Sequence, residues 1–233
     1  GNKYRFNAQL HYVWNCGEGQ AVNNFLKKLQ LENIVTFEQY DANGYDHMRI
    51  PNYALDIPYD KTELSNRLSK LFPEHKDAFT KFLDEVWQTA AELAKLPEPL
   101  NLAFILKHGL SSQHVFKYRH STLQQVFDKF KLPLEAQTLL ALQWPDFLLP
   151  PKKLSFFAWV TLFTHYCNGA YYPTHHFEQV INSLIKTIEE NDGEIIYNQK
   201  VTEFILEQDT VLGVTCMDKN DHSLFNEYQG KDV

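Results

Sequence analysis

The sequence predicts an α+β fold in which a mixed or antiparallel sheet is interrupted by a large helical block. Short runs typical of strands occupy the first 59 residues. Helical periodicity then dominates residues 60–167, with little strand signal. Strand-type runs return after residue 193. A helical block that interrupts a sheet is typical of a cap over a cofactor or ligand site.

The first expected element is a half-buried strand at residues 3–14, "KYRFNAQLHYVW", where apolar and polar side chains alternate. The turn-forming run "NCGEG" ends this strand. A helix is expected from about Gln20, because apolar residues then recur at helical spacing. Its apolar stripe consists of Val22, Phe25, Leu26 and Leu29.

A hairpin is expected next. Residues 34–40, "IVTFEQY", and 45–50, "YDHMRI", have strand character, and "DANG" between them predicts the turn. Asn43 and Gly44 tolerate the positive φ that a tight hairpin needs. Residues 53–59, "YALDIPY", add a third strand, which Pro58 confines to an edge or ends.

The helical block begins with a capping signal. Asp60 and Glu63 are spaced as in an N-terminal capping box, and Pro73 suits the first turn of the following long helix. The proline-rich "LPEPL" at 96–100 ends that helix. Further helices are expected at 100–108, 121–131, 133–144 and about 153–166.

The C-terminal part is expected to contain a helix and several strands. The helix spans about 175–190, and Gly193 is expected in the left-handed conformation after its end. Its expected buried face comprises Phe177, Val180, Ile181, Leu184, Ile185 and Ile188. The expected strands are "EIIYN", "KVTEFILEQ", "VLGVTCMD" and "HSLFNEY", with "QDT" and "DKND" as hairpin tips.

Composition excludes some classes of function. The formal net charge is −7, whereas a nucleic-acid-binding protein needs a concentrated basic face. No apolar run approaches the roughly 20 residues of a membrane-spanning helix. Three scattered cysteines, Cys16, Cys167 and Cys216, favour reduced thiols in the cytoplasm.

No metal site is predicted. His114 and His120 are six residues apart, and the adjacent rings of His175 and His176 seldom bind one ion together. No cysteine or carboxylate pattern completes a ligand set.

Several segments, in this order, resemble the phytoene desaturase, carotenoid isomerase and retinol saturase family of flavoproteins, which are related to the amine oxidases. The matching segments are "YRFNAQLHY" followed by "GEG", "AVNNFLKKLQL", "DANGYDHMRIPN", "LFPEHKDAFTKFL" and the stretch from Gly169 to Asp218, which begins "GAYYPTHHFEQ". The likeness covers both ends and the early middle of the chain and is weak from about 98 to 150.

The resemblance implies an FAD-dependent, phytoene dehydrogenase-like oxidoreductase that desaturates, saturates or isomerises a polyene or other long apolar substrate. Residues 1–19 correspond to the edge of the FAD domain and the start of the substrate domain. Residues 20–167 correspond to the substrate-binding cap, and 168–233 to the return into a partial FAD-binding α/β domain. The family's glycine fingerprint and its late flavin segment are absent, so we expect a fragment that binds FAD poorly alone and is inactive alone.

The resemblance also implies site residues. His11 and Tyr12 lie at the strand end that faces the flavin and substrate cleft, so they are the candidate catalytic residues. Val201 matches a valine that offers its backbone to the adenine, and Tyr172 and Pro173 are further candidates for cofactor contact. Aromatic side chains are the candidates for the apolar substrate: Trp14, Phe156, Phe157, Trp159 and Phe163.

One departure from the family leaves alternatives open. His175 and His176 stand where relatives usually have two glycines, which let the backbone approach a flavin. A non-redox protein that binds apolar ligands is therefore an alternative, and an amine-oxidase-like enzyme is a weaker one.

The stretch 147–163, "FLLPPKKLSFFAWVTLF", has two interpretations. It is either a surface that dips into a bilayer, which would make the protein peripheral to a membrane, or a buried helix preceded by a solvated loop. The buried helix is favoured, because apolar runs usually belong to the core.

Overall fold

The computed structural model describes residues 6–7, 10–96, 112–143 and 146–230. The chain divides into two compact units, Gly1–Phe177 and Glu178–Val233. The expected boundary at residues 167 and 168 therefore falls inside the first unit, and the roles assigned to the three segments stay predictions. Helices and small antiparallel sheets make up both units, which confirms the α+β class.

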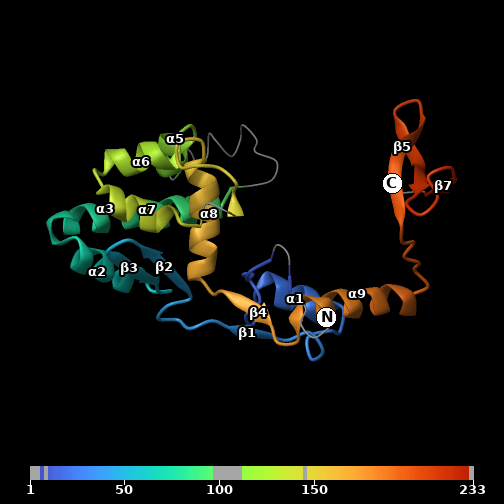
Figure 1. The fold of residues 1–233 in the computed structure, drawn as a ribbon, viewed down its shortest axis with the longest axis horizontal. Helices are drawn as coiled ribbons and strands as arrows, with labels where there is room; N and C mark the ends of the chain where they lie inside the picture. The colour runs from blue at the N-terminus through green and yellow to red at the C-terminus, as the bar shows by residue number, and fades with distance from the viewer. Residues whose placement is uncertain (1–5, 8–9, 97–111, 144–145, 231–233) are drawn as a thin grey trace. The chain divides into compact units, whose positions relative to one another are not determined.

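Two small antiparallel sheets and a group of helices form the first unit (Figure 1). Strand β1 (Phe37–Gln39) pairs with β4 (Tyr171–Pro173), and β2 (Asp46–Ile50) pairs with β3 (Tyr53–Ile57). The helices are α1 (Ala21–Lys28), α2 (Lys61–Leu71), α3 (Lys76–Leu93), α5 (Gln113–Tyr118), α6 (Leu123–Lys129), α7 (Leu134–Ala141) and α8 (Phe156–Cys167), with a 3₁₀ turn at Pro73–His75.

Local signals define the start of several helices. The Asp60 side chain accepts a hydrogen bond of 2.7 Å from the Glu63 backbone N–H, which caps α2 as predicted. Thr122 and Gln125 form a reciprocal capping box at the start of α6. The helix predicted at 100–108 lies outside the described residues.

The predicted hairpin is wrong in its pairing. β1 pairs with β4, more than 130 residues later, and β2 turns directly into β3 through Pro51 and Asn52. Asn52 has φ +68°, so it takes the left-handed turn position that we expected within "DANG". Strand propensity is local, whereas pairing depends on which segment the tertiary fold brings alongside.

The predicted N-terminal strand is also not formed over the described residues 6–7 and 10–14. There, only Val13 makes a β-bridge, with Tyr171. Phe6 and Leu10 are exposed, because the alternating pattern has no neighbouring sheet to cover its apolar face. In α1, Leu26 is buried as expected, but Phe25 is exposed.

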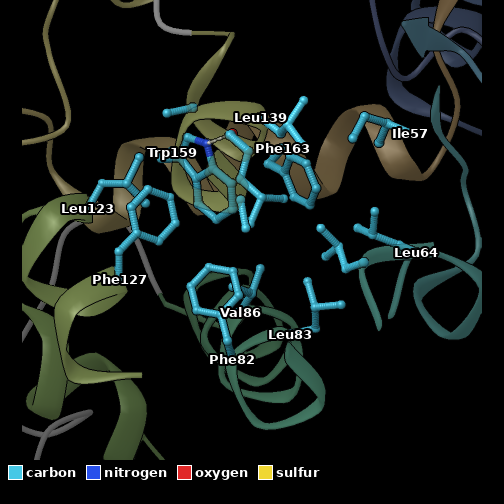
Figure 2. Close-up of a cluster of buried hydrophobic side chains, with 14 of the residues drawn as sticks. Ile57, Leu64, Phe82, Leu83, Val86, Leu123, Phe127, Leu139, Trp159 and Phe163 are labelled. Atoms are coloured by element: carbon cyan, nitrogen blue, oxygen red, sulfur yellow. Dashed lines mark hydrogen bonds between the residues drawn. The ribbon is translucent and has the colours of Figure 1, made fainter. Parts of the chain in front are cut away.

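The main core lies where α3, α6, α7 and α8 meet (Figure 2). The Trp159 ring stacks on Phe163 at a centroid distance of 4.6 Å, and its indole N–H donates to the Leu140 carbonyl at 3.3 Å. Phe82 and Phe127 pack around Trp159. Because the indole N–H is satisfied, this large ring is buried without leaving a polar group unpaired.

The second unit contains most of α9 (His176–Glu190) and a three-stranded antiparallel sheet in the order β5-β6-β7. The strands are β5 (Gln199–Glu207), β6 (Thr210–Asp218) and β7 (Phe225–Gln229). A Cβ at Gly213 would lie 2.1 Å from the Tyr228 carbonyl oxygen, so β6 and β7 approach this closely only because residue 213 is glycine.

Three details of this unit differ from the prediction. Residues 194–198, "EIIYN", form no strand. Asp192, not Gly193, has the left-handed backbone, with φ +60°. The expected apolar face of α9 is exposed or only half-buried, since Ser183 is the one residue of this helix that is buried.

Candidate functional site

A hydrogen-bonded group of polar side chains lies in the first unit, where Tyr12, Asp46 and Gln143 meet. The Tyr12 hydroxyl donates to Asp46 Oδ2 at 2.8 Å, and Gln143 Nε2 donates to the same oxygen at 3.1 Å. Tyr12 directly precedes the Val13–Tyr171 bridge, Asp46 begins β2, and Gln143 follows α7. Three segments that are distant in sequence therefore build this group.

Aromatic rings surround the Tyr12 side chain. The Tyr166 ring lies 4.3 Å from it, and the rings of Tyr40 and Tyr45 lie at 5.8 and 6.3 Å, all in edge-to-face arrangements. Trp14 packs edge-on against Tyr166 at 5.0 Å. These rings exclude water, which strengthens the hydrogen bonds that they enclose.

Tyr12 is held in its neutral form. Burial, followed by the charge of Asp46 and the hydrogen bond to it, raises the pKa of Tyr12 well above its usual range. A phenol with such a pKa keeps its proton at neutral pH. The geometry therefore suits Tyr12 as a hydrogen-bond donor that orients Asp46 rather than as an acid that releases a proton.

Gln143 offers an open acceptor at this site. The residue is only 5% exposed, and its Oε1 has no hydrogen-bond partner among the described residues. Buried polar atoms are usually satisfied, so this oxygen is a place for a donor such as a ligand hydroxyl or a water molecule.

His11 and Asp146 lie at the edge of this group, and His11 is exposed. Desolvation and the charge of Asp46 raise the pKa of Asp146, whereas the proximity of His11 opposes that rise. His11 is thus close enough to Asp146 to interact with it, and both side chains are exposed.

A cavity of about 620 Å³ lies between the C-terminal halves of α3 and α8. Small and apolar residues of α3 form one wall, and the α8 wall contributes polar atoms. The lining residues are Trp87, Ala90, Ala91, Leu93 and Ala94 of α3 and its end, with Thr161, Thr164, His165 and Asn168 of α8 and its end. This volume is in the range of about 300–1,000 Å³ that is common for small-molecule sites.

Trp14 connects the cavity with the hydrogen-bonded group of Tyr12, Asp46 and Gln143, which we call the tyrosine group. The Trp14 ring lies 5.7 Å from the ring of His165, which lines the cavity, and 5.0 Å from Tyr166, which packs on Tyr12. The structure therefore brings Trp14, one of the predicted substrate residues, beside the described cavity.

The other predicted substrate residues lie elsewhere. Phe156, Trp159 and Phe163 are buried in the core and do not line the α3–α8 cavity. Phe157 is half-buried and packs against the same core. Packing between helices accounts for the burial of these rings, and their role in binding stays a prediction.

The predicted cofactor residues occupy both units. In the first unit, Tyr172 is half-buried on β4, Pro173 is buried, and the Tyr172 ring lies 5.2 Å from Phe177. In the second unit, Val201 on β5 is 52% exposed. Among the residues that the structure describes, β5 pairs only with β6, so one edge of this strand has no strand partner there.

His176 has an unusual backbone. Its φ is +72°, a left-handed conformation that favours glycine. The first residue of α9 therefore has a backbone conformation that favours glycine while it carries an imidazole, whose ring lies 6.3 Å from that of Tyr172.

Asp46, Gln143 and the α3–α8 cavity were not predicted from the sequence. Asp46 lies in the segment "DANGYDHMRIPN" but was given no role, and Gln143 lies at a helix end outside the segments that carry the resemblance. The only sequence signal for the cavity was the group of alanines at Ala90, Ala91 and Ala94, which is equally typical of close helix packing.

The described residues lack two kinds of feature. They contain no group of three or more His, Cys, Asp or Glu side chains placed to hold a metal ion. No helix in the described ranges combines the length and the apolar character that crossing a bilayer requires.

Comparison with known proteins relates the chain to retinol reductases. All-trans-retinol 13,14-reductase from Rattus norvegicus is 25% identical over 218 residues, which cover 88% of this chain and 35% of that protein. The reductases from Danio rerio and Macaca fascicularis are 24% and 22% identical, over 87% and 97% of this chain. The chain thus spans about a third of the length of these curated relatives. The expected resemblance is confirmed in this coarse form.

Other comparisons add little. No protein-family model matches the chain. A crystal structure of Rab GDI from Plasmodium falciparum aligns with 89% of this chain and 46% of that one, at 15% identity and a TM-score of 0.47. A TM-score below 0.5 supports no argument about function.

Proposed function

We propose that this chain is the substrate-binding portion of an FAD-dependent oxidoreductase that acts on a polyene or other long apolar substrate. The observation that carries the proposal is the similarity of nearly the whole chain to enzymes named for the reduction of a retinol. Because the chain spans about a third of those proteins, the activity belongs to a longer, phytoene dehydrogenase-like polypeptide.

The α3–α8 cavity is the proposed site for part of the substrate. Its volume of about 620 Å³ accommodates an apolar ligand of drug-like size. Trp87 and the alanines of α3 supply apolar contact, and Asn168 offers an amide to a polar terminus. Excluding water from the reacting bond is the main task of such a protein when the cofactor carries the chemistry.

The tyrosine group, near the cavity, is proposed to fix the orientation of the bound ligand. Tyr12 orients Asp46, and the open Oε1 of Gln143 accepts a hydrogen bond from a ligand hydroxyl. His11, which is exposed beside Asp146, is the proposed proton carrier between this group and solvent.

The chain fits only part of FAD. When bound, FAD supplies the hydride or electrons of the reaction. The open edge of β5 at Val201 suits a backbone contact with the adenine, and Tyr172 and Pro173 are the proposed contacts in the first unit. The glycine turn before α1 does not suit the pyrophosphate, because a Cβ at Gly17 would already meet the Tyr171 hydroxyl at 2.5 Å.

Filling the cavity tests the substrate proposal. We expect Ala94→Phe to weaken binding of all-trans-retinol to the full-length protein by about tenfold or more, since the new ring occupies the volume of the ligand. The measurement is quenching of tryptophan fluorescence by retinol. Ala158→Phe is the matched control, because Ala158 is exposed on α8 and does not line the cavity. Equal affinities of the two variants would refute the assignment.

A second candidate function, an apolar-ligand-binding protein without redox activity, is favoured by His176. An imidazole at this left-handed position fills space that glycine would leave open. Full-length protein that is purified without the visible absorbance of flavin, yet binds retinol, would support this candidate. If His176→Gly then gained flavin absorbance, the imidazole would be the cause of the loss.

A further inference from the structure

Two lysines from different helices meet at one tyrosine ring. Tyr118, the last residue of α5, is almost fully buried, and Lys117 precedes it in the same helix. Lys129 is the last residue of α6. Lys117 Nζ lies 4.9 Å from the centroid of the Tyr118 ring, and Lys129 Nζ lies 4.8 Å from it. Two groups of like charge are therefore held close together, which favours the loss of a proton from one of them.

The carboxylate of Glu85 on α3 compensates the charge of Lys117. Lys117 Nζ donates to Oε1 of Glu85 at 2.6 Å and to Oε2 at 2.7 Å. His114 Nε2 lies 3.7 Å from the same Oε2. Lys129 instead donates to the Tyr118 hydroxyl, at 3.0 Å, and this acceptor carries no charge. Of the two lysines, Lys129 is thus the one whose ammonium is poorly compensated.

The two lysines consequently differ in how readily they lose a proton. Burial works against the charge of Lys117, yet its hydrogen bonds, of which that to Glu85 is the strongest, raise its pKa above the usual range. Burial, followed by the hydrogen bond with Lys117 and its charge, lowers the pKa of Lys129, and the charge of Glu85 opposes this effect. Lys129 therefore becomes a free amine at a lower pH than an ordinary surface lysine does.

A free amine beside a cation is an activated nucleophile. Enzymes that form Schiff bases use lysines that are activated by a neighbouring cationic group. Lys129 is exposed, so a reactant can reach it. Tyr118 supplies the acid that such a reaction needs. Burial, followed by the hydrogen bond with Glu85, raises the pKa of Tyr118 to about 12, so its hydroxyl keeps its proton at neutral pH.

We propose that Lys129 is an aldehyde-reactive lysine that forms a Schiff base. Nζ attacks the carbonyl carbon, a C–N bond forms, and one amine proton passes to the carbonyl oxygen. The Tyr118 hydroxyl, 3.0 Å from Nζ, then protonates the new hydroxyl group, which leaves as water. The iminium nitrogen returns its remaining proton to Tyr118, so amine and aldehyde yield imine and water.

An aldehyde is favoured over an acyl donor as the reactant. Loss of water requires an acid, and Tyr118 places one beside Nζ, whereas acyl transfer from a thioester releases its leaving group without that acid. This proposal does not rest on the redox activity proposed above, because it involves neither the flavin nor the α3–α8 cavity.

Reductive trapping in the full-length protein tests the proposal. The protein is incubated at neutral pH with hexanal and sodium cyanoborohydride, which reduces the imine to a stable secondary amine, and peptide mass spectrometry quantifies each alkylated lysine. We expect Lys129 to be alkylated about threefold or more faster than Lys131, an exposed lysine two residues later. Equal rates at the two lysines would overturn the proposal.

A variant of the neighbouring lysine separates activation from simple exposure. Lys117→Gln removes the adjacent cation and frees Glu85 to pair with Lys129, so alkylation of Lys129 should fall about threefold or more. Lys61→Gln is the matched control, because it also removes a lysine from an ion pair, with Asp84, and should leave the rate at Lys129 unchanged. An unchanged rate in Lys117→Gln, or an equal loss in the control, would contradict activation by Lys117. If Lys117→Gln does not fold, the comparison of Lys129 with Lys131 in the native protein decides.

The role of the hydroxyl is tested by Tyr118→Phe. Phenylalanine keeps the buried ring and removes the acid, so trapping at Lys129 should slow about threefold or more while trapping at Lys131 is unchanged. Near-UV circular dichroism checks that the core around this ring is intact. The same rate in the variant and the native protein would refute the part assigned to Tyr118.

Discussion

The two units of the chain bury apolar side chains to very different degrees. In the first unit, large rings such as Phe82, Phe127 and Trp159 are almost fully buried. Among residues 178–230 of the second unit, only Ser183, Gly213 and Cys216 are buried, whereas Phe204 and Leu206 are more than 60% exposed. Both units have well-formed secondary structure, so the difference lies in packing and not in local propensity.

This contrast shows that an amphipathic pattern in the sequence does not ensure that another element covers its apolar face. α9 has apolar residues at helical spacing, and β5 and β6 are rich in β-branched residues, yet the described residues of this unit leave most of these side chains exposed or half-buried. Elements with one apolar face normally pack against another layer. The first unit has such layers and the second does not.

The largest expected effect concerns the first unit's core. Trp159→Ala should destabilise it by about 4 kcal/mol, since a fully buried ring and its hydrogen bond to Leu140 are lost. The corresponding change in the second unit, Phe204→Ala, should alter stability by only about 0.5 kcal/mol or less, because that ring is 65% exposed. Urea unfolding followed by near-UV circular dichroism compares them. Similar losses for both variants would remove the contrast.

The second-largest expected effect is a loss of stability caused by a steric clash in the second unit. Gly213→Ala places a methyl group against the Tyr228 carbonyl, so we expect about 1–3 kcal/mol of destabilisation confined to the three-stranded sheet. Hydrogen exchange of β7 amides should accelerate while that of α3 stays unchanged. Gly44→Ala is the control, since its Cβ would lie 3.2 Å from a side-chain atom instead. Unchanged exchange in β7 would show that the sheet relaxes easily.

Alkaline pH should destabilise the first unit. Burial raises the pKa of Tyr12, Tyr45 and Tyr166, so above their ordinary value near 10 the unfolded chain releases protons that the folded unit retains. The contribution of these three tyrosines is therefore fully present below about pH 10 and falls as the pH rises beyond it.

One substitution isolates the contribution of Tyr12. Between about pH 10 and 11, Tyr12→Phe should reduce the loss of stability by about 1 kcal/mol, because an unfolded tyrosine is half ionised at the lower of these pH values and mostly ionised at the higher. The measurement is urea unfolding at each pH. An identical pH slope in the native and variant proteins would show that burial and Asp46 do not hold the hydroxyl neutral.

The smallest expected effect concerns a surface ion pair. Hydrogen bonds from His47 and Arg49 lower the pKa of Asp56, so its contribution is present above its ordinary value of 3.8 and is lost as the pH falls through the lowered value. All three side chains are substantially exposed, and Asp56→Asn should cost only about 0.2–1 kcal/mol at pH 7. Acid unfolding of the two proteins measures it, and a larger loss would mean that Asp56 also fixes the β2–β3 hairpin.

Sequence reasoning succeeded where the signals were local. Asp60 caps α2, and α8 and α9 begin and end within three residues of the expected positions. A cap depends on groups within one turn of the helix, so the sequence contains the information. Of the predicted site residues, Tyr12 and Trp14 lie beside the candidate site, but their partners Asp46 and Gln143 were not foreseen.

The sequence by itself determined the class of fold, most helix positions and the resemblance that leads to the proposed substrate. Only the tertiary structure decided that β1 pairs with β4, that Tyr12 meets Asp46 and Gln143, and that one amphipathic unit is covered while the other is open. The physical reason is that helix caps and periodicity arise from neighbours in the chain. Pairing, burial and pKa shifts depend on residues brought together from 30 to 130 positions apart.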